Sequence, residues 1–176
     1  MVKPLGIFAG IVVVGLALIV GGLRLTDHSA TATPPPAPMP LSQAQFVRTG
    51  NAVCADYYRA LFKSQTISHP QAKTLKMITR GLRIQVPLMD RLATGLRPLV
   101  PPRRDAATYR RLLSVLGQEL YDAHAVLHAF ETGQFRRGVL IARHGGHLDR
   151  AYNSLSRKIG LKVCGLTGRQ VKARYG

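Results

Sequence analysis

Four histidines are the strongest candidates for a chemical site in this sequence. His124 and His128 lie four residues apart, a spacing that places both side chains on one side of a helix. His144 and His147 flank a glycine pair in the stretch RHGGHLD. If the two segments form antiparallel helices joined by a tight turn, His124 and His144 lie at similar heights. Imidazoles that meet in this way can bind Zn²⁺, Cu²⁺ or haem iron, so a metal- or haem-binding helical bundle is one interpretation. The other interpretation is that these histidines are hydrogen-bonded within the fold or exposed to solvent and bind nothing.

Catalytic arrangements have little support. The sequence contains no G-x-S-x-G elbow, no HExxH pair and no glycine-rich phosphate loop, and no serine has an identifiable base. Glu119 and Asp122 lie three residues apart and could resemble an acid–base dyad. We expect them instead to pair with arginines, the candidates being Arg110, Arg111 and Arg143. The sequence therefore predicts a protein without enzymatic activity and without a cofactor.

Positive charge dominates the composition. Lys and Arg number 25 against 8 Asp and Glu, which gives a formal net charge of +17 at pH 7. From residue 41 onward the chain has 23 basic and 7 acidic side chains, and Arg outnumbers Lys 17 to 6. Guanidinium groups bind phosphate and carboxylate in bidentate geometry, so the composition indicates anionic partners. A solvated basic surface without a partner is the alternative.

Three arginine doublets are the candidate anion-binding residues, because they lie at the ends or on the solvent faces of expected helices. They are Arg103-Arg104, Arg110-Arg111 and Arg136-Arg137. Nucleic acid is the less favoured partner, since no helix-turn-helix spacing is evident and aromatic residues are too sparse for base stacking. Anionic envelope polymers or lipid headgroups fit the charge better.

The chain has two cysteines, Cys54 and Cys164, separated by 110 positions. Two cysteines alone cannot complete a four-ligand zinc site, and no C-x-x-C motif is present. Cys54 falls on the apolar face of the first expected helix, and Cys164 follows the last one. The first and fourth helices of an up-down bundle are neighbours, so we expect a disulfide, with two buried thiols as the alternative. A disulfide would persist outside the cytosol.

Apolar residues recur at three- and four-residue steps through most of the domain, as in amphipathic helices. The four expected helices occupy residues 42–61, 68–96, 105–133 and 135–160. Ser42-Gln-Ala-Gln45 reads as a capping box, and Pro87 should kink or break the second helix. Gly133 and Gly160 suit the left-handed stops of the third and fourth helices, while Gly145-Gly146 should interrupt the fourth. Short connections between such helices favour an antiparallel bundle.

The amino-terminal part has a different character. Residues 5–23 form a run of 19 without a charged or strongly polar side chain, about the length that spans a bilayer as a helix. We expect an uncleaved anchor; a signal peptide cleaved near Ala30-Thr31-Ala32 or a buried soluble helix are the alternatives. Lys3 and the α-amino group favour a cytoplasmic amino terminus. Residues 29–40 contain five prolines and no charge, which is typical of a semi-rigid spacer.

Three motifs carry a resemblance to a known group: Asn51-Ala-Val-Cys54, Leu99-Val-Pro101-Pro102 and the closing Ile159-Gly-Leu-Lys-Val-Cys164-Gly165. The chain resembles small membrane-anchored envelope proteins of actinobacteria, over roughly residues 5–165. That resemblance implies an amino-terminal span, a Pro/Ala-rich linker and an all-helical domain with one cysteine near each end. It implies architecture and location and no particular activity.

Together these patterns predict an all-α protein with an amino-terminal transmembrane helix, a Pro-rich linker and an antiparallel four-helix bundle-like domain. The expected divisions are a cytoplasmic amino terminus (1–4), a signal anchor (5–25), a linker (26–41), the helical domain (42–165) and a basic tail (166–176). We expect a single-pass protein of the cell membrane with its domain outside the cytoplasm. The expected function is that of a structural or interaction module whose basic surface meets anionic polymers or headgroups.

Overall fold

The computed structural model describes residues 39–64 and 74–176, and their regular structure is entirely helical. The elements are α1 (Gln43–Lys63), α2 (Leu75–Leu96), the 3₁₀ helix η1 (Arg103–Asp105), α3 (Ala106–Glu131), α4 (Phe135–Lys158) and α5 (Gly168–Tyr175). No strand occurs among these residues, so the predicted all-α class is confirmed.

Several helix ends follow the expected local chemistry. The Ser42 side chain accepts a hydrogen bond from the Gln45 amide at 3.3 Å, and the Gln45 side chain accepts from the Ser42 amide at 3.0 Å, which completes the capping box. Gly133 and Gly160 have φ of 74° and 85°, so both adopt the left-handed conformation that ends a helix. The expected start of the second helix, at residues 68–71, lies outside the described residues.

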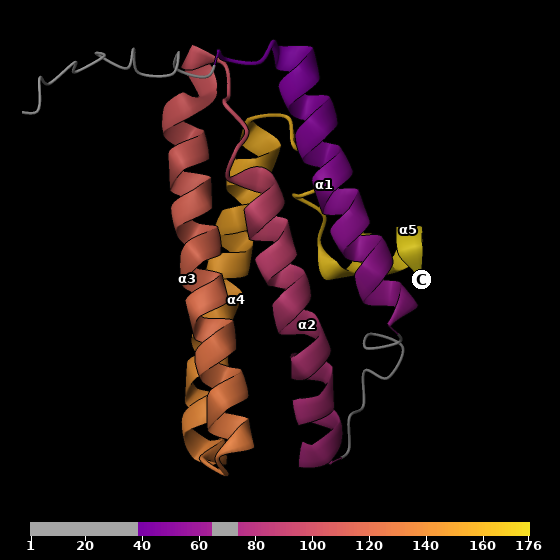
Figure 1. Ribbon diagram of the computed structural model, residues 1–176, viewed down its shortest axis with the longest axis vertical. Helices are drawn as coiled ribbons and strands as arrows, with labels where there is room; N and C mark the ends of the chain where they lie inside the picture. The colour runs from indigo at the N-terminus through magenta and orange to yellow at the C-terminus, as the bar shows by residue number, and fades with distance from the viewer. Residues whose placement is uncertain (1–38, 65–73) are drawn as a thin grey trace, which may run out of the picture. The chain divides into compact units, whose positions relative to one another are not determined.

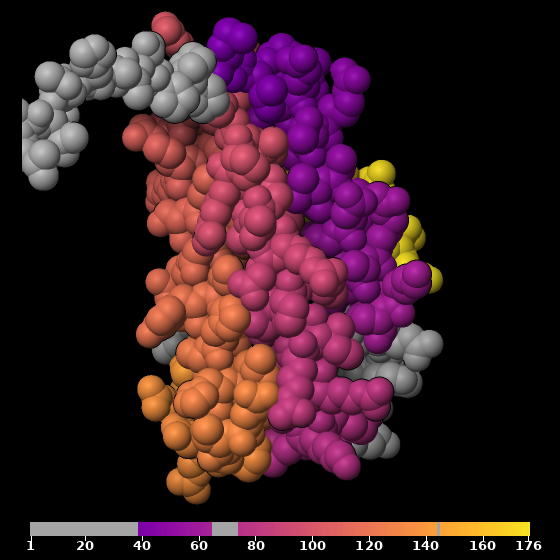
Figure 2. Space-filling view, viewed as in Figure 1, coloured from indigo at the N-terminus to yellow at the C-terminus, as the bar shows by residue number. Residues whose placement is uncertain are grey.

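The long helices run antiparallel in chain order and form a bundle (Figure 1). α1 packs against α2, α2 against α3, and α3 against α4. Figure 2 shows the side chains of α1, α2 and α3 meeting along one face. Phe46 and Tyr109 pack edge to face with ring centroids 5.0 Å apart, and the Tyr109 hydroxyl donates to the Leu96 carbonyl at 2.6 Å. All three residues are buried, and they belong to a core that also includes Tyr152 of α4 and Leu161 after it.

Two local expectations differ from the structure. α4 runs without interruption through Gly145 and Gly146, because glycine keeps its amide donor and costs a helix only about 1 kcal/mol relative to alanine. α2 also continues through Pro87 without a break, and the alternative of a kink there stays a prediction. Residues 166–176, expected as a basic tail, contain α5, whose Val171 is buried and whose Tyr175 ring lies 5.8 Å from that of Tyr58 on α1.

The chain enters the bundle beside the connection between α2 and η1. The Leu41 amide donates to the Val100 carbonyl at 3.0 Å, which fixes this point next to Pro101. None of the helices in residues 39–64 and 74–176 is long and apolar enough to cross a membrane. The expected anchor (5–25) and most of the expected linker (26–41) lie outside the described residues.

Candidate functional site

The two cysteines form the predicted disulfide. Cys54 on α1 is bonded to Cys164 in the segment between α4 and α5, with Cα atoms 5.1 Å apart. Both residues are buried, with exposures of 1% and 0%. The Tyr152 hydroxyl of α4 lies 3.8 Å from the Cys54 sulfur, and the Tyr58 hydroxyl donates to the Cys164 carbonyl at 3.5 Å. The bond therefore ties α1 to the carboxyl-terminal side of α4 inside the protein.

Side chains of α1 hold the same segment independently of the disulfide. Asn51 accepts a hydrogen bond from the Val163 amide at 2.8 Å and donates to the Gly160 carbonyl at 3.4 Å. Leu161 is fully buried over Gly50, where an added Cβ would lie 2.6 Å from a Leu161 methyl carbon. We call residues 159–165 with these α1 contacts the clasp.

Each of the described histidines has its own neighbours. His124 Nε2 lies 3.2 Å from Asp90 Oδ1 of α2, and His147 Nδ1 lies 2.8 Å from a guanidinium nitrogen of Arg150. His128 is exposed near the end of α3, and the side chain of His144 is not among those described. In the described part of the chain, no group of three or more His, Cys, Asp or Glu side chains is arranged to hold a metal ion. The metal or haem site stays a prediction.

The six predicted anion-binding arginines are all exposed, but they form two separate groups. Arg103-Arg104 lies in η1, and Arg110-Arg111 lies near the start of α3. Arg136-Arg137 lies at the start of α4, just past the other end of α3. α3 has 26 residues and is therefore about 39 Å long. The structure thus brings four of these arginines to one end of the bundle and two to the other.

Sequence reasoning missed a regular row of arginines along one side of α4. Arg143 and Arg150 follow Arg136 at intervals of seven residues, and Arg157 continues the interval. All four side chains are exposed. We call these four residues the arginine row. The recurrence is visible in the sequence, but the solvent exposure of this side of α4 required the structure.

A second missed feature is an acidic cavity of about 310 Å³ between the long helices. Its lining includes Glu119 and Asp122 of α3 and Asp149 of α4, together with Tyr57 of α1 and apolar side chains. Burial raises the pKa of Glu119 to about 7, and the charges of Asp149 and Asp122 add to the rise. The expected pairing of Glu119 and Asp122 with arginines does not occur among the described residues, where Asp122 accepts from Gln118 at 2.8 Å.

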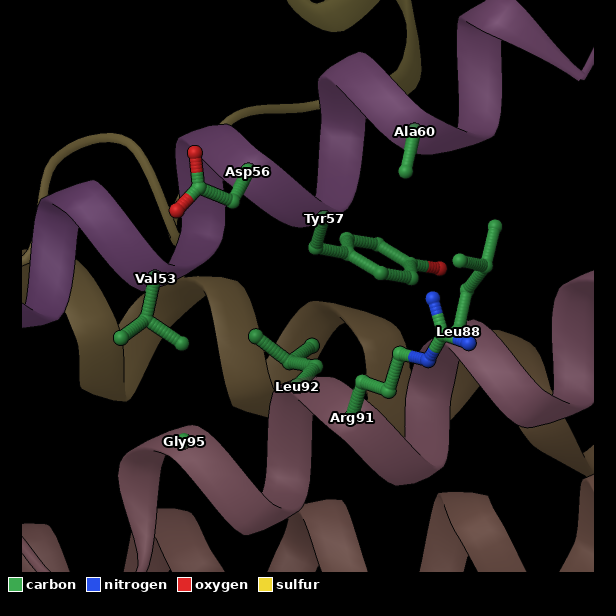
Figure 3. A pocket seen from close by; sticks show the side chains of 8 residues that line it. All are labelled: Val53, Asp56, Tyr57, Ala60, Leu88, Arg91, Leu92 and Gly95. Carbon is green, nitrogen blue, oxygen red and sulfur yellow. The ribbon is translucent and has the colours of Figure 1, made fainter.

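Tyr57 also lines a cavity of about 330 Å³ between α1 and α2. Figure 3 shows its ring extending from α1 toward Leu88 and Arg91 of α2. Burial raises the pKa of Tyr57 to about 12, and the charge of Glu119 contributes to the rise. The hydroxyl therefore keeps its proton near neutral pH and acts as a hydrogen-bonding group, without the character of a base.

Comparisons with protein-family models, with curated proteins and with solved structures find no match to this chain.

Proposed function

We propose that this chain is a membrane-anchored interaction module of the cell envelope, whose four-helix bundle-like domain lies outside the cytoplasm and binds anionic polymers or lipid headgroups. The observation that carries the proposal is uncompensated charge. Of the 17 arginines from residue 48 onward, three lie within ion-pair distance of a carboxylate among the described residues: Arg59, Arg83 and Arg104. The other arginines have no carboxylate within ion-pair distance among the described residues, so their charge is left for a polyanion, to which arginine binds in bidentate geometry.

Two observations support the location. The Cys54–Cys164 disulfide is of a kind that persists in oxidising compartments and is rare in the cytosol. The apolar run at residues 5–23 has the length of a membrane span. The resemblance to membrane-anchored envelope proteins of actinobacteria is consistent with both. The metal or haem alternative has less support, because His124 already faces Asp90 and His147 faces Arg150.

The proposal is tested by binding a labelled linear polyanion to the full-length protein in zwitterionic detergent across a salt series. Binding through arginines releases counterions, so the logarithm of the affinity should fall linearly with the logarithm of the salt concentration. Four to six contacts give a slope of about −3 to −4 on the scale for single strands. Binding that does not change with salt would contradict the proposal.

A further inference from the structure

The arginine row has a geometry of its own within the basic surface. Seven residues of α-helix rise about 10.5 Å, so Arg136, Arg143, Arg150 and Arg157 are spaced regularly over about 32 Å of α4. Successive positions drift by only about 20° around the helix, so the row follows one side of α4 as a gentle spiral. The spacing is close to the Debye length of about 8–10 Å in physiological salt. Each guanidinium therefore presents a nearly independent cation.

The residues between these arginines also suit an anionic partner. Leu140, His147 and Ser154 fill the same strip at the same interval of seven, and none of them is acidic. All three are exposed, Leu140 to 59%. The one carboxylate of α4 belongs to Asp149, which lines the acidic cavity and is placed beside Glu119 of α3. The strip thus combines regular cations with an apolar side chain, an imidazole and a hydroxyl group.

No other helix covers this side of α4. Of the long helices, only α3 packs against α4 in the described part of the chain. Two side chains of the arginine row are held by hydrogen bonds within the protein. The Arg157 guanidinium donates to the Gly165 carbonyl of the clasp at 2.9 Å, and Arg150 contacts His147. Side chains that are already held lose less conformational entropy on binding.

We infer that the arginine row is the binding surface for an extended linear polyanion, which lies along α4 with one anionic group at each arginine. This inference rests on the proposed function and names its surface and its partner class. A flexible linear chain can follow the drift of the row around the helix, whereas a flat bilayer surface meets fewer of its members at once. Binding to a bilayer surface is therefore an outcome that the experiment must separate.

The test uses the full-length protein in zwitterionic detergent with fluorescent linear polyphosphate. The variant carries Arg136→Gln, Arg143→Gln and Arg150→Gln, and it leaves Arg157 in place because that residue also supports the clasp. The matched control removes three exposed cations by Arg48→Gln on α1, Arg91→Gln on α2 and Arg97→Gln directly after α2. Both variants change the net charge equally.

Loss of three contacts should weaken binding about 100-fold at about 0.1 M salt and reduce the salt slope from about −3 to about −0.7. The control should stay within about threefold of the unmodified protein, because its sites lie away from the row and are screened from it. Polyphosphate chains that reach along the row should bind more tightly than short chains, and inorganic phosphate should bind weakly.

Four results would overturn the inference. Equal losses in both variants would mean that binding is spread over the whole basic surface, and the proposed function would stand without the row. A variant that loses affinity for vesicles of phosphatidylcholine with phosphatidylglycerol, but not for polyphosphate, would make a bilayer the partner. No binding by the unmodified protein at low salt would refute the proposed function as well. If the triple variant does not fold, Arg143→Gln alone should weaken binding about fivefold, and an unchanged affinity there would also refute the row.

Discussion

Glu119 shows how one residue can acquire unusual chemistry from its surroundings. It lies in a cavity with two other carboxylates, and its pKa rises to about 7 because burial and like charge both disfavour its ionised form. The folded protein therefore holds a proton that the unfolded chain releases at lower pH. The sequence spacing of Glu119 and Asp122 indicated neither this cavity nor the approach of Asp149, since both depend on how α3 and α4 pack.

The raised pKa of Glu119 predicts a pH-dependent contribution to stability. The native carboxyl is protonated below about pH 7 and the unfolded one only below about 4.5, so its contribution to the free energy of unfolding should fall as the pH rises from about 4.5 to 7 and then stay level. Glu119→Gln should remove this dependence and stabilise the protein at pH 8 by about 1–2 kcal/mol. Urea unfolding of both proteins at pH 5 and pH 8 measures the difference. An equal effect of the substitution at both pH values would contradict the prediction.

At the scale of the elements, the clasp joins the two ends of the domain. A covalent bond across 110 residues restricts the unfolded chain, and the entropy model gives a stabilisation of up to about 4–5 kcal/mol. The double variant Cys54→Ser/Cys164→Ser should lose about 2–4 kcal/mol of unfolding free energy, as measured by urea denaturation. A reductant should destabilise the unmodified protein by a similar amount and leave the variant unchanged. If reduction has no effect on the unmodified protein, the bond does not support the fold.

Elements whose ends depend on nearby residues could be predicted from the sequence. The capping box at Ser42 and the left-handed stops at Gly133 and Gly160 involve backbone within one helical turn. The continuity of α4 through Gly145 could not, because contacts with α3 outweigh the low helix propensity of glycine. α5 was missed for the same reason, since eight residues make a marginal helix alone and Val171 must be buried against the rest of the domain.

At the scale of the whole molecule, the positions of the charged side chains say more about a binding surface than the net charge does. Of the seven acidic side chains after residue 41, three gather at one cavity, and the other four are spread over the rest of the domain. The sequence predicted the excess of positive charge but divided the candidate arginines into doublets. Side chains seven residues apart share one side of a helix. The seven-residue spacing from Arg136 to Arg143 therefore describes the basic surface of α4 better than the arginine doublets do.

The proposed location of the domain outside the cytoplasm can be tested through the oxidation state of its two cysteines. If the domain lies outside the cytoplasm, Cys54 and Cys164 should resist alkylation when the cellular protein is denatured without a reductant, and both should be labelled once a reductant is added. The measurement is the mass shift of the protein on non-reducing gels, with a cytosolic cysteine protein as the control for lysis. Complete alkylation of both cysteines without a reductant would contradict the extracytoplasmic location.

The clasp also determines which contacts of the domain can form first while the chain is being synthesised. α1 leaves the ribosome early, but its contacts with Leu161, Val163 and Cys164 come from a segment more than 100 residues later. α3 and α4, by contrast, are joined by a short turn and can pair as soon as both exist. Until residues 159–165 are made, the side of α1 that carries Gly50 and Cys54 has no cover from the clasp. Completion of the bundle therefore waits until residues 159–165 have been synthesised.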